Sequence, residues 1–242
     1  MSKDAAAELA PKGVLRAGIN MGNFLLVTGR DEAGDPTGVA PDMAREIAAR
    51  LGALVRYVPY ARPNQVADAA ETGAWDIGLI GAEPARAEKI AFSPAYVEIE
   101  ATYLAPPGSA IMTIAEVDRP GVRIAALAKA AYDLWLERNI RCASLVRAAS
   151  AEAAAKLLAD GEADVLAALR PGLAAETLRL PGARILDGRF TAVQQAVGTL
   201  KTNLAGAAFL NDFVEEAKAS GLVQRLVERH GVVGRLTVAA AG

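Results

Sequence analysis

The side chains that most often do chemistry are scarce in this chain. Its 242 residues include one histidine, His230, and one cysteine, Cys142. A single cysteine excludes an intramolecular disulfide and a cysteine-based zinc cluster, and one histidine is too few for a histidine-based metal site. His230 ends an amphipathic stretch next to Gly231, which predicts a surface histidine at a helix C-terminus. We expect no metal, no cofactor and no catalytic group.

Three cationic side chains are the better candidates for chemistry. A guanidinium group, such as that of Arg86, can bind a planar carboxylate through two parallel hydrogen bonds. The alternative is a surface arginine that starts a helix and pairs with Glu83 or Glu88. If Lys129 and Arg170 face the same site, the three charges favour an anionic ligand. The alternative for these two is that they point to solvent, as most lysines and arginines do.

Composition excludes several classes of partner. The net charge is -2, with 52% hydrophobic and 22% charged residues. The chain therefore has no strong positive electrostatic potential that would attract nucleic acid or an acidic membrane surface. No stretch reaches the roughly 20 apolar residues that span a bilayer, so we expect no membrane insertion. The first residues, MSKDAAAELAPKG, contain no apolar signal region. Either the protein is cytoplasmic from a native Met1, or the chain is a mature form.

Strands and helices alternate along the chain, which predicts an α/β protein with largely parallel sheets. Turn-forming residues at 31–38 predict a hairpin connection, and no repeat of 20–50 residues is visible. Strands are expected at 14–20, 54–60, 76–82, 99–108, 122–127, 143–149, 163–169, 183–188 and 191–199. Helices are expected at 41–52, 65–75, 130–139, 150–161, 171–180, 204–221 and 222–231.

The order of these segments resembles a known family. The chain carries PDMAREIAARLG, then TGAWDIG, EPARAEKIAFSPAY, GVRIAAL and DGEADVLAAL in sequence. Over about residues 13–231 this is similar to the extracellular solute-binding proteins of family 3, which deliver amino acids to ABC transporters. The densest stretch, 73–96, contains G-x-x-D, an arginine six residues before Phe92, and F-S-P-x-Y. Each motif alone is a weak signal, and the resemblance depends on the order and spacing of all of them.

The resemblance implies a periplasmic-binding-protein-like type II fold, with two α/β lobes joined by two hinge strands. Lobe 1 would comprise 1–98 and 194–242, and lobe 2 would comprise 99–193. The hinges would lie near Glu98–Thr102 and Val193–Thr199. Closure of such lobes brings two partial sites together around a small ligand. It further implies a monomer in the periplasm that works with an ABC permease.

The resemblance also implies where the ligand binds. Arg86 matches the family's carboxylate-binding arginine, and the loop after the first strand would place an apolar wall or polar groups on the ligand, against the alternative of a plain turn. Gln194 lies on the second hinge, where a hinge role is favoured. The residues expected at the ligand are Asn20, Asn23, Phe24, Asn64, Gly81, Ala82, Arg86, Lys129, Ala130, Ala131, Arg170 and Gln194.

Several of these positions depart from the family's pattern. The family's hydroxyl-bearing patch before the arginine is Ile80-Gly81-Ala82 here, although Gly81 still offers a backbone N–H. The family's glycine followed by Ser/Thr in lobe 2 is Ala128–Tyr132. The acidic residue that neutralises the ligand's α-ammonium, five residues after the aspartate that matches Asp164, is Leu169. A buried ammonium without a carboxylate costs several kcal/mol. We therefore expect a carboxylate ligand other than a standard α-amino acid, with an apolar acid as a further possibility.

Two other functions remain open from the sequence. Some proteins of this fold are cyclohexadienyl dehydratases, which need a positioned general acid. The nearest acidic residue here, Glu176, is expected one turn inside a helix, so an enzyme is the minority interpretation. The third hypothesis is a ligand-sensing module that acts on a partner protein.

Overall fold

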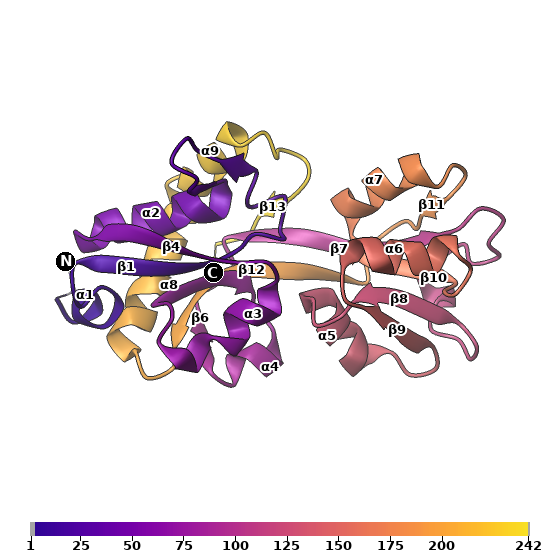
Figure 1. Cartoon of the computed structure of the whole chain (residues 1–242), viewed down its shortest axis with the longest axis horizontal. Coiled ribbons are helices and arrows are strands. Elements are labelled where there is room, and N and C mark those ends of the chain that lie inside the picture. Colours follow the sequence, from indigo (N-terminus) through magenta and orange to yellow (C-terminus); the bar gives the residue numbers. More distant parts are fainter. Residues whose placement is uncertain (1–2, 242) are drawn as a thin grey trace. The chain divides into compact units, whose positions relative to one another are not determined.

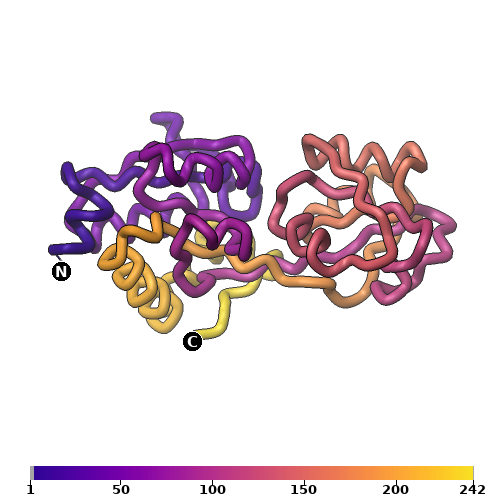
Figure 2. The backbone as a smooth tube through the Cα atoms, turned by 90° about the horizontal axis from the view of Figure 1, so that it is seen from below, coloured from indigo at the N-terminus to yellow at the C-terminus, as the bar shows by residue number. Residues whose placement is uncertain are grey.

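The chain folds into two compact units. The computed structural model describes residues 3–241. Unit 1 comprises Met1–Glu98 and Gln194–Gly242, and unit 2 comprises Ile99–Val193. The chain passes between the units within two strands, β7 (Val97–Ala105) and β12 (Thr191–Leu200). Figure 1 labels the elements, and Figure 2 follows the backbone from a second direction.

Unit 1 is built on three parallel strands in the order β4-β1-β5, to which β12 adds antiparallel. Helices cover both faces, with α2 on one side of the strands and α3 on the other (Figure 1). The strands are β1 (Val14–Asn20), β2 (Gly29–Arg30), β3 (Pro36–Thr37), β4 (Leu54–Tyr60), β5 (Ile77–Gly81), β6 (Ile90–Phe92) and β13 (Thr237–Val238). The helices are α1 (Lys3–Leu9), α2 (Val39–Leu51), α3 (Pro63–Asp68), the 3-10 turn η1 (Ala70–Thr72), α4 (Pro84–Ala87), α8 (Leu204–Ala219) and α9 (Leu222–Arg229).

Unit 2 repeats this plan with three parallel strands in the order β9-β8-β10, to which β7 adds antiparallel. Its strands are β8 (Arg123–Leu127), β9 (Ser144–Ala148), β10 (Val165–Leu169) and β11 (Arg184–Ile185). Its helices are the 3-10 turn η2 (Ile114–Glu116), α5 (Ala131–Asn139), α6 (Ala151–Ala159) and α7 (Arg170–Arg179).

The strands of unit 2 are apolar on both faces because each face supports its own core. Ile124 and Val165 belong to the cluster that contains Leu136 of α5. The neighbouring residues Ala125 and Leu166 belong to the cluster that contains Leu158 of α6. Successive strand residues point to opposite faces, and helices on both faces bury them all. Continuous apolar runs are typical of such doubly covered parallel sheets.

The same arginine–aspartate clamp joins the first and third parallel strands of each unit. Arg16 donates through Nε and Nη2 to the Asp76 carboxylate at 2.9 and 2.5 Å, and through Nη1 to the Gly73 carbonyl. Arg123 makes the same contacts with Asp164, at 3.1 and 2.9 Å, and with the Gly161 carbonyl at 2.9 Å. Both clamps use a G-x-x-D sequence, so the two units are structural repeats. Because the matching residues Arg16 and Arg123 lie much more than 50 residues apart, this repeat is not visible among sequence repeats of 20–50 residues.

Local signals in the sequence predict several element ends correctly. α2 ends at Gly52 with φ 68°, the left-handed conformation that glycine adopts without steric cost. Ser150 accepts a hydrogen bond from the Ala153 N–H at 3.0 Å and so caps α6. The hairpin expected at 31–38 is formed by β2 and β3.

Other boundaries were predicted wrongly. α2 starts at Val39, two residues before the proline that was expected to open it. Gly38 permits this start: at φ 146°, a Cβ there would lie 2.2 Å from the Leu26 carbonyl oxygen. The helix expected over 65–75 is shorter and ends in η1, and the strand expected over 183–188 is only Arg184–Ile185.

The fold class is confirmed as α/β with parallel sheets covered by helices in each unit. Among residues 3–241, no helix combines the length and apolar character needed to span a membrane.

Asp118 in unit 2 gives a stability prediction that depends on pH. Its carboxylate accepts the backbone N–H groups of Arg141, Cys142 and Ala143 at 2.7–3.2 Å. These hydrogen bonds, that of Ala143 first, hold the pKa of Asp118 below its usual value. The stabilisation is therefore fully present above the unfolded pKa of about 3.9 and disappears as the pH falls through the folded pKa.

We expect Asp118→Ala to lower the urea midpoint at pH 7 and to unfold at nearly the wild-type midpoint in strong acid. Urea titrations of both proteins at a series of pH values measure the difference. A deficit that stays constant down to low pH would contradict the carboxylate's role.

Candidate functional site

The residues of unit 1 that were predicted to bind ligand lie at one edge of its sheet. Asn20 ends β1, Gly81 ends β5, and Asn64 lies in α3 directly after β4. Because the three strands are parallel, their carboxyl ends share one edge, and open α/β sheets bind ligands beyond this edge. The structure therefore brings these lobe-1 candidates to one side of unit 1.

Arg86 is the most deeply buried cation among these candidates. It lies in α4, and only 6% of the residue is exposed. Its Nη1 donates a hydrogen bond to the Gly81 carbonyl at 2.6 Å. Burial lowers its pKa to about 10, against the opposing effects of the Glu83 and Asp68 charges, so the side chain stays protonated at neutral pH. Arg86 is therefore buried rather than at the surface, although it lies at the start of a helix and the Glu83 charge acts on it, as the alternative expected.

Asn20, Asn23 and Phe24 form the turn after β1. The Asn23 side-chain oxygen accepts the Leu25 N–H at 3.2 Å, and its carbonyl accepts the N–H groups of Leu26 and Val27. The Asn20 side-chain oxygen accepts the Gly22 N–H at 3.2 Å. Both asparagines thus stabilise the turn, which favours the structural alternative for them. Phe24 is the exposed member, with the Arg235 guanidinium 5.4 Å from its ring centroid.

The remaining unit 1 candidates are held mainly by backbone contacts. The Ala82 N–H donates to the Gln194 carbonyl at 2.7 Å, which continues the pairing of β5 with β12. Asn64 donates through Nδ2 to Asp68 at 3.4 Å, one turn further along α3. Gln194 therefore ties the end of β5 to β12, the strand by which the chain returns from unit 2 to unit 1, and the Asn64 contact is internal to its helix.

Unit 2 presents an unusual turn between β8 and α5. Among the residues that the structure describes, one non-glycine residue has a positive φ: Lys129, at 60°. Its N–H donates to the buried Asp133 carboxylate at 2.8 Å, which stabilises the left-handed conformation. Ala130 and Ala131 are buried in a core cluster of unit 2. The alanine methyl groups thus pack inward, and the exposed side chain of this turn is that of Lys129.

Arg170 has a carboxylate partner that sequence reasoning missed. Its Nε donates to Glu100 at 2.8 Å, and its Nη2 donates to the Gly188 carbonyl. Arg189 adds a second contact to Glu100 at 3.6 Å. The Glu100 carboxylate thus offsets the charge of Arg170 within unit 2. Arg170 therefore contributes less positive electrostatic potential to the predicted ligand site than expected from the sequence. Glu100 was visible as a charged residue inside the apolar run 99–108.

His230 is not the surface histidine that the sequence predicts. It caps the C-terminus of α9, but its side chain is only 13% exposed and its Nε2 lies 2.8 Å from Asp42 Oδ2. Arg45 and Arg229 also pair with Asp42, the latter at 3.4 Å. The cluster links the start of α2 to the end of α9 inside unit 1.

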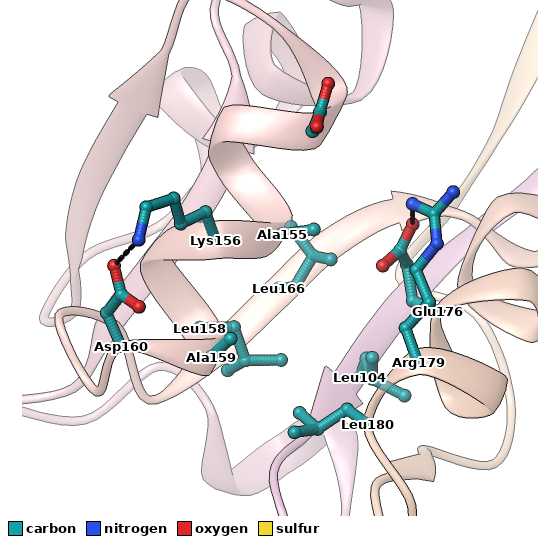
Figure 3. Close-up of a pocket in the computed structure, with 11 residues that line it drawn as sticks. Leu104, Ala155, Lys156, Leu158, Ala159, Asp160, Leu166, Glu176, Arg179 and Leu180 are labelled. Atoms are coloured by element: carbon teal, nitrogen blue, oxygen red, sulfur yellow. Dashed lines mark hydrogen bonds and ion pairs between the residues drawn. The ribbon is translucent and has the colours of Figure 1, made fainter.

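A pocket of about 420 Å³ opens between α6 and α7 in unit 2 (Figure 3). Its apolar lining includes Leu158 of α6, Leu180 directly after α7, and one leucine each from β7 and β10. Four of its charged side chains form the pairs Lys156–Asp160 and Glu176–Arg179, and Glu152 also lines it. The lining includes none of the predicted ligand residues. Glu176 lies seven residues into α7, deeper than the one turn expected.

The described residues contain no cluster of three His, Cys, Asp or Glu side chains that could hold a metal ion.

Comparison with known structures gives the fold independently. An arginine-binding protein from T. maritima, as its P235GK mutant, is 22% identical, covers 94% of this chain and 99% of its own, and has a TM-score of 0.73. The ancestral amino acid-binding protein AncCDT-1, described as a precursor of cyclohexadienyl dehydratase, is 23% identical with 92% and 97% coverage and a TM-score of 0.71. A putative ABC-transporter binding component from Wolinella succinogenes, complexed with lysine, is 21% identical with 90% and 95% coverage and a TM-score of 0.74.

No curated protein matches the sequence. The model of the bacterial extracellular solute-binding proteins, family 3, matches residues 16–233, which is most of the chain. The matched region includes all of unit 2, most of unit 1, the two arginine–aspartate clamps and Arg86. The chain therefore belongs to the bacterial extracellular solute-binding proteins of family 3, with the periplasmic-binding-protein-like type II fold.

Proposed function

We propose that this protein captures a small carboxylate-bearing organic ligand for uptake by an ABC transporter, and that Arg86 holds the carboxylate. The observation that carries the proposal is the burial of a charged guanidinium group at the carboxyl edge of the unit 1 sheet. Burial of a charge is costly unless it is compensated, and a guanidinium fork matches a carboxylate through two hydrogen bonds. The Gly81 carbonyl and the Glu83 and Asp68 charges compensate part of this cost, and a ligand carboxylate would add two charge-assisted hydrogen bonds.

The proposed ligand is a carboxylate other than a standard α-amino acid. Leu169 stands where the family places the acid that pairs with an ammonium group, and it immediately precedes the first turn of α7, which contains no acidic residue. Glu100 is already engaged by Arg170 and Arg189. An ammonium group would have to compete with these two cations. Lys129 is proposed to add a positive charge to the ligand site.

The structures of relatives bound to arginine or lysine suggest the alternative to this proposal, that the ligand is an amino acid. A cationic amino acid is the ligand in their descriptions, and this chain shares about a fifth of its sequence with them. If Glu100 exchanges its two arginine partners for a ligand ammonium group, the protein would bind an amino acid. The two outcomes differ in which ligands stabilise the folded protein.

A thermal-shift screen of amino acids, dicarboxylates and aromatic acids tests the proposal. A ligand at 100 times its Kd stabilises a protein by about 2.7 kcal/mol, which raises the Tm of a chain of this size by about 5 °C or more. We expect carboxylates without an α-amino group to give the largest shifts. Stabilisation by ordinary α-amino acids alone would reject the ligand class, and no stabilisation by any acid would reject ligand capture.

The remaining parts of the proposal follow the family. Its members are extracellular or periplasmic solute-binding proteins, so we place this one in the periplasm, as a monomer that delivers its ligand to an ABC permease. A dehydratase activity is not proposed, because Glu176 is paired with Arg179 and lies well inside α7. No structural observation favours a sensing role.

A further inference from the structure

A pocket lies in unit 1 away from the carboxyl ends of its strands. It has a volume of about 440 Å³ and is lined by Pro11, Lys12, Val14, Arg16, Arg56 and Asp76. Small-molecule sites usually fall between about 300 and 1,000 Å³. Arg16 precedes Asn20 by four residues on β1, so the pocket lies about 13 Å along the strand from the proposed ligand site. It also lies nearer the amino ends of the strands.

The pocket concentrates positive charge. Arg16 and Arg56 are register partners in the parallel pair β1–β4, so their side chains leave the same face of the sheet. Directly opposed like charges destabilise a sheet. Asp76 is the one carboxylate in the lining and is fully engaged by Arg16. Within residues 3–241 neither Arg56 nor Lys12 has an ion pair or hydrogen-bonded side-chain partner. Two positive charges are therefore left uncompensated.

Unit 2 shows that the strand clamp does not need these two cations. Its equivalent clamp joins Arg123 to Asp164 with the same contacts. There the register partner of the arginine is Ser144, an uncharged residue. The cation four residues before the arginine, Arg119, is neutralised by Glu116 at 3.2 Å. Unit 2 thus builds the clamp without an excess of charge, so Arg56 and Lys12 require another explanation.

A role at the sheet edge explains only part of this arrangement. β4 is the edge strand of unit 1, and charged residues on edge strands discourage pairing with other chains. That role would account for Arg56 alone, whereas the structure adds Lys12 and a pocket between the cations. The guanidinium fork of Arg56 and the ammonium group of Lys12 on one cavity are the chemistry that recognises a doubly charged oxyanion.

We propose that Lys12, Arg16 and Arg56 form an accessory binding site for a small doubly charged oxyanion, a phosphate group or a dicarboxylate. Arg56 and Lys12 bind the anion directly, while Asp76 keeps the Arg16 guanidinium in a fixed orientation. Because Lys12 and Arg56 are solvent-exposed, binding weakens as salt screens them, over a Debye length of about 10 Å at 0.1 M ionic strength. The site works independently of Arg86.

Nuclear magnetic resonance at low ionic strength tests the site with inorganic phosphate and with succinate as probes. Near pH 8, where phosphate is mainly a dianion, we expect saturable shifts of the Lys12, Arg16 and Arg56 amides. The matching positions in unit 2, Arg123 and Ser144, provide an internal control and should not move. The probe that binds more tightly identifies the chemical class, since the two probes carry the same charge.

Two variants of equal charge decide the assignment. Arg56→Gln should weaken the tighter probe at least about tenfold, whereas Lys201→Gln, which removes an exposed cation of unit 1 elsewhere, should leave its affinity unchanged. Equal affinity in Arg56→Gln and wild type would overturn the proposal. So would shifts spread over all exposed cations, or no saturable shift with either probe. None of these readouts depends on the ligand of Arg86, so the two proposals fail separately.

Discussion

Replacing Arg86 by alanine should raise the Kd for the proposed carboxylate ligand by about 100-fold or more. Removal of one partner from a buried, hydrogen-bonded charge pair costs about 2–5 kcal/mol in other complexes, and Arg86 is 6% exposed. Calorimetric titration with the best ligand from the thermal-shift screen measures the change. Because burial lowers the Arg86 pKa only to about 10, wild-type affinity should be constant from about pH 6 to 8.

Two further variants separate a carboxylate clamp from a structural role. Arg86→Lys keeps the charge but loses the planar fork, so we expect an affinity between wild type and alanine, weakened by about tenfold. Lys89→Met removes a neighbouring exposed cation that pairs with Glu71 and should leave affinity unchanged. Melting curves establish that each variant is folded. Folded Arg86→Lys and Arg86→Ala proteins with wild-type affinity would reject the clamp.

Local signals in the sequence identified most of the architecture. The alternation of apolar segments predicted the parallel strands because each such strand is covered on both faces. Gly52 and Ser150 predicted helix ends because their conformational and hydrogen-bonding roles depend on neighbouring residues alone. Val39 was missed as a helix start because the close approach of Gly38 to Leu26 arises only once the hairpin is folded.

The ion pairs of the candidate site were not predictable in the same way. Arg170 and Glu100 are 70 residues apart, and His230 and Asp42 are 188 apart. Nothing in the local sequence chooses between the many carboxylates of the chain as partners. Only the fold brings these groups together, and it changes the roles expected for them. Arg170 is paired with the carboxylate of Glu100, and His230 is mostly buried and contacts Asp42. A search for G-x-x-D in both halves would have found the repeated clamp.

Leu169 shows what the resemblance adds beyond such patterns. Periodicity assigns it to the end of a strand, where the structure also places it. Only a comparison with the family shows that an acid is missing at this position, and that absence is the basis of the ligand proposal. Glu100, which the resemblance did not point to, then limits the excess of positive charge in unit 2. The ligand class therefore depends on both residues together.

The second large effect concerns Asp133, which organises the turn that presents Lys129. Its carboxylate is 1% exposed and accepts the Lys129 N–H at 2.8 Å and Arg147 Nε at 2.9 and 3.1 Å. We expect Asp133→Asn to lower the free energy of unfolding by about 3 kcal/mol, because removal of one partner from a buried ion pair leaves the other groups uncompensated. Chemical denaturation followed by circular dichroism measures the loss.

Glu137 provides a matched control, because it pairs with the same arginine. Arg147 Nη2 lies 3.0 Å from Glu137, whose side chain is 57% exposed. Exposed ion pairs contribute about 0–1 kcal/mol, so Glu137→Gln should cost less than about 1 kcal/mol. Faster amide exchange at Lys129 should accompany Asp133→Asn only, since that variant alone weakens the bond that fixes the turn. Equal losses in the two variants would show that burial does not distinguish the two carboxylates, and that the left-handed turn is held by other contacts.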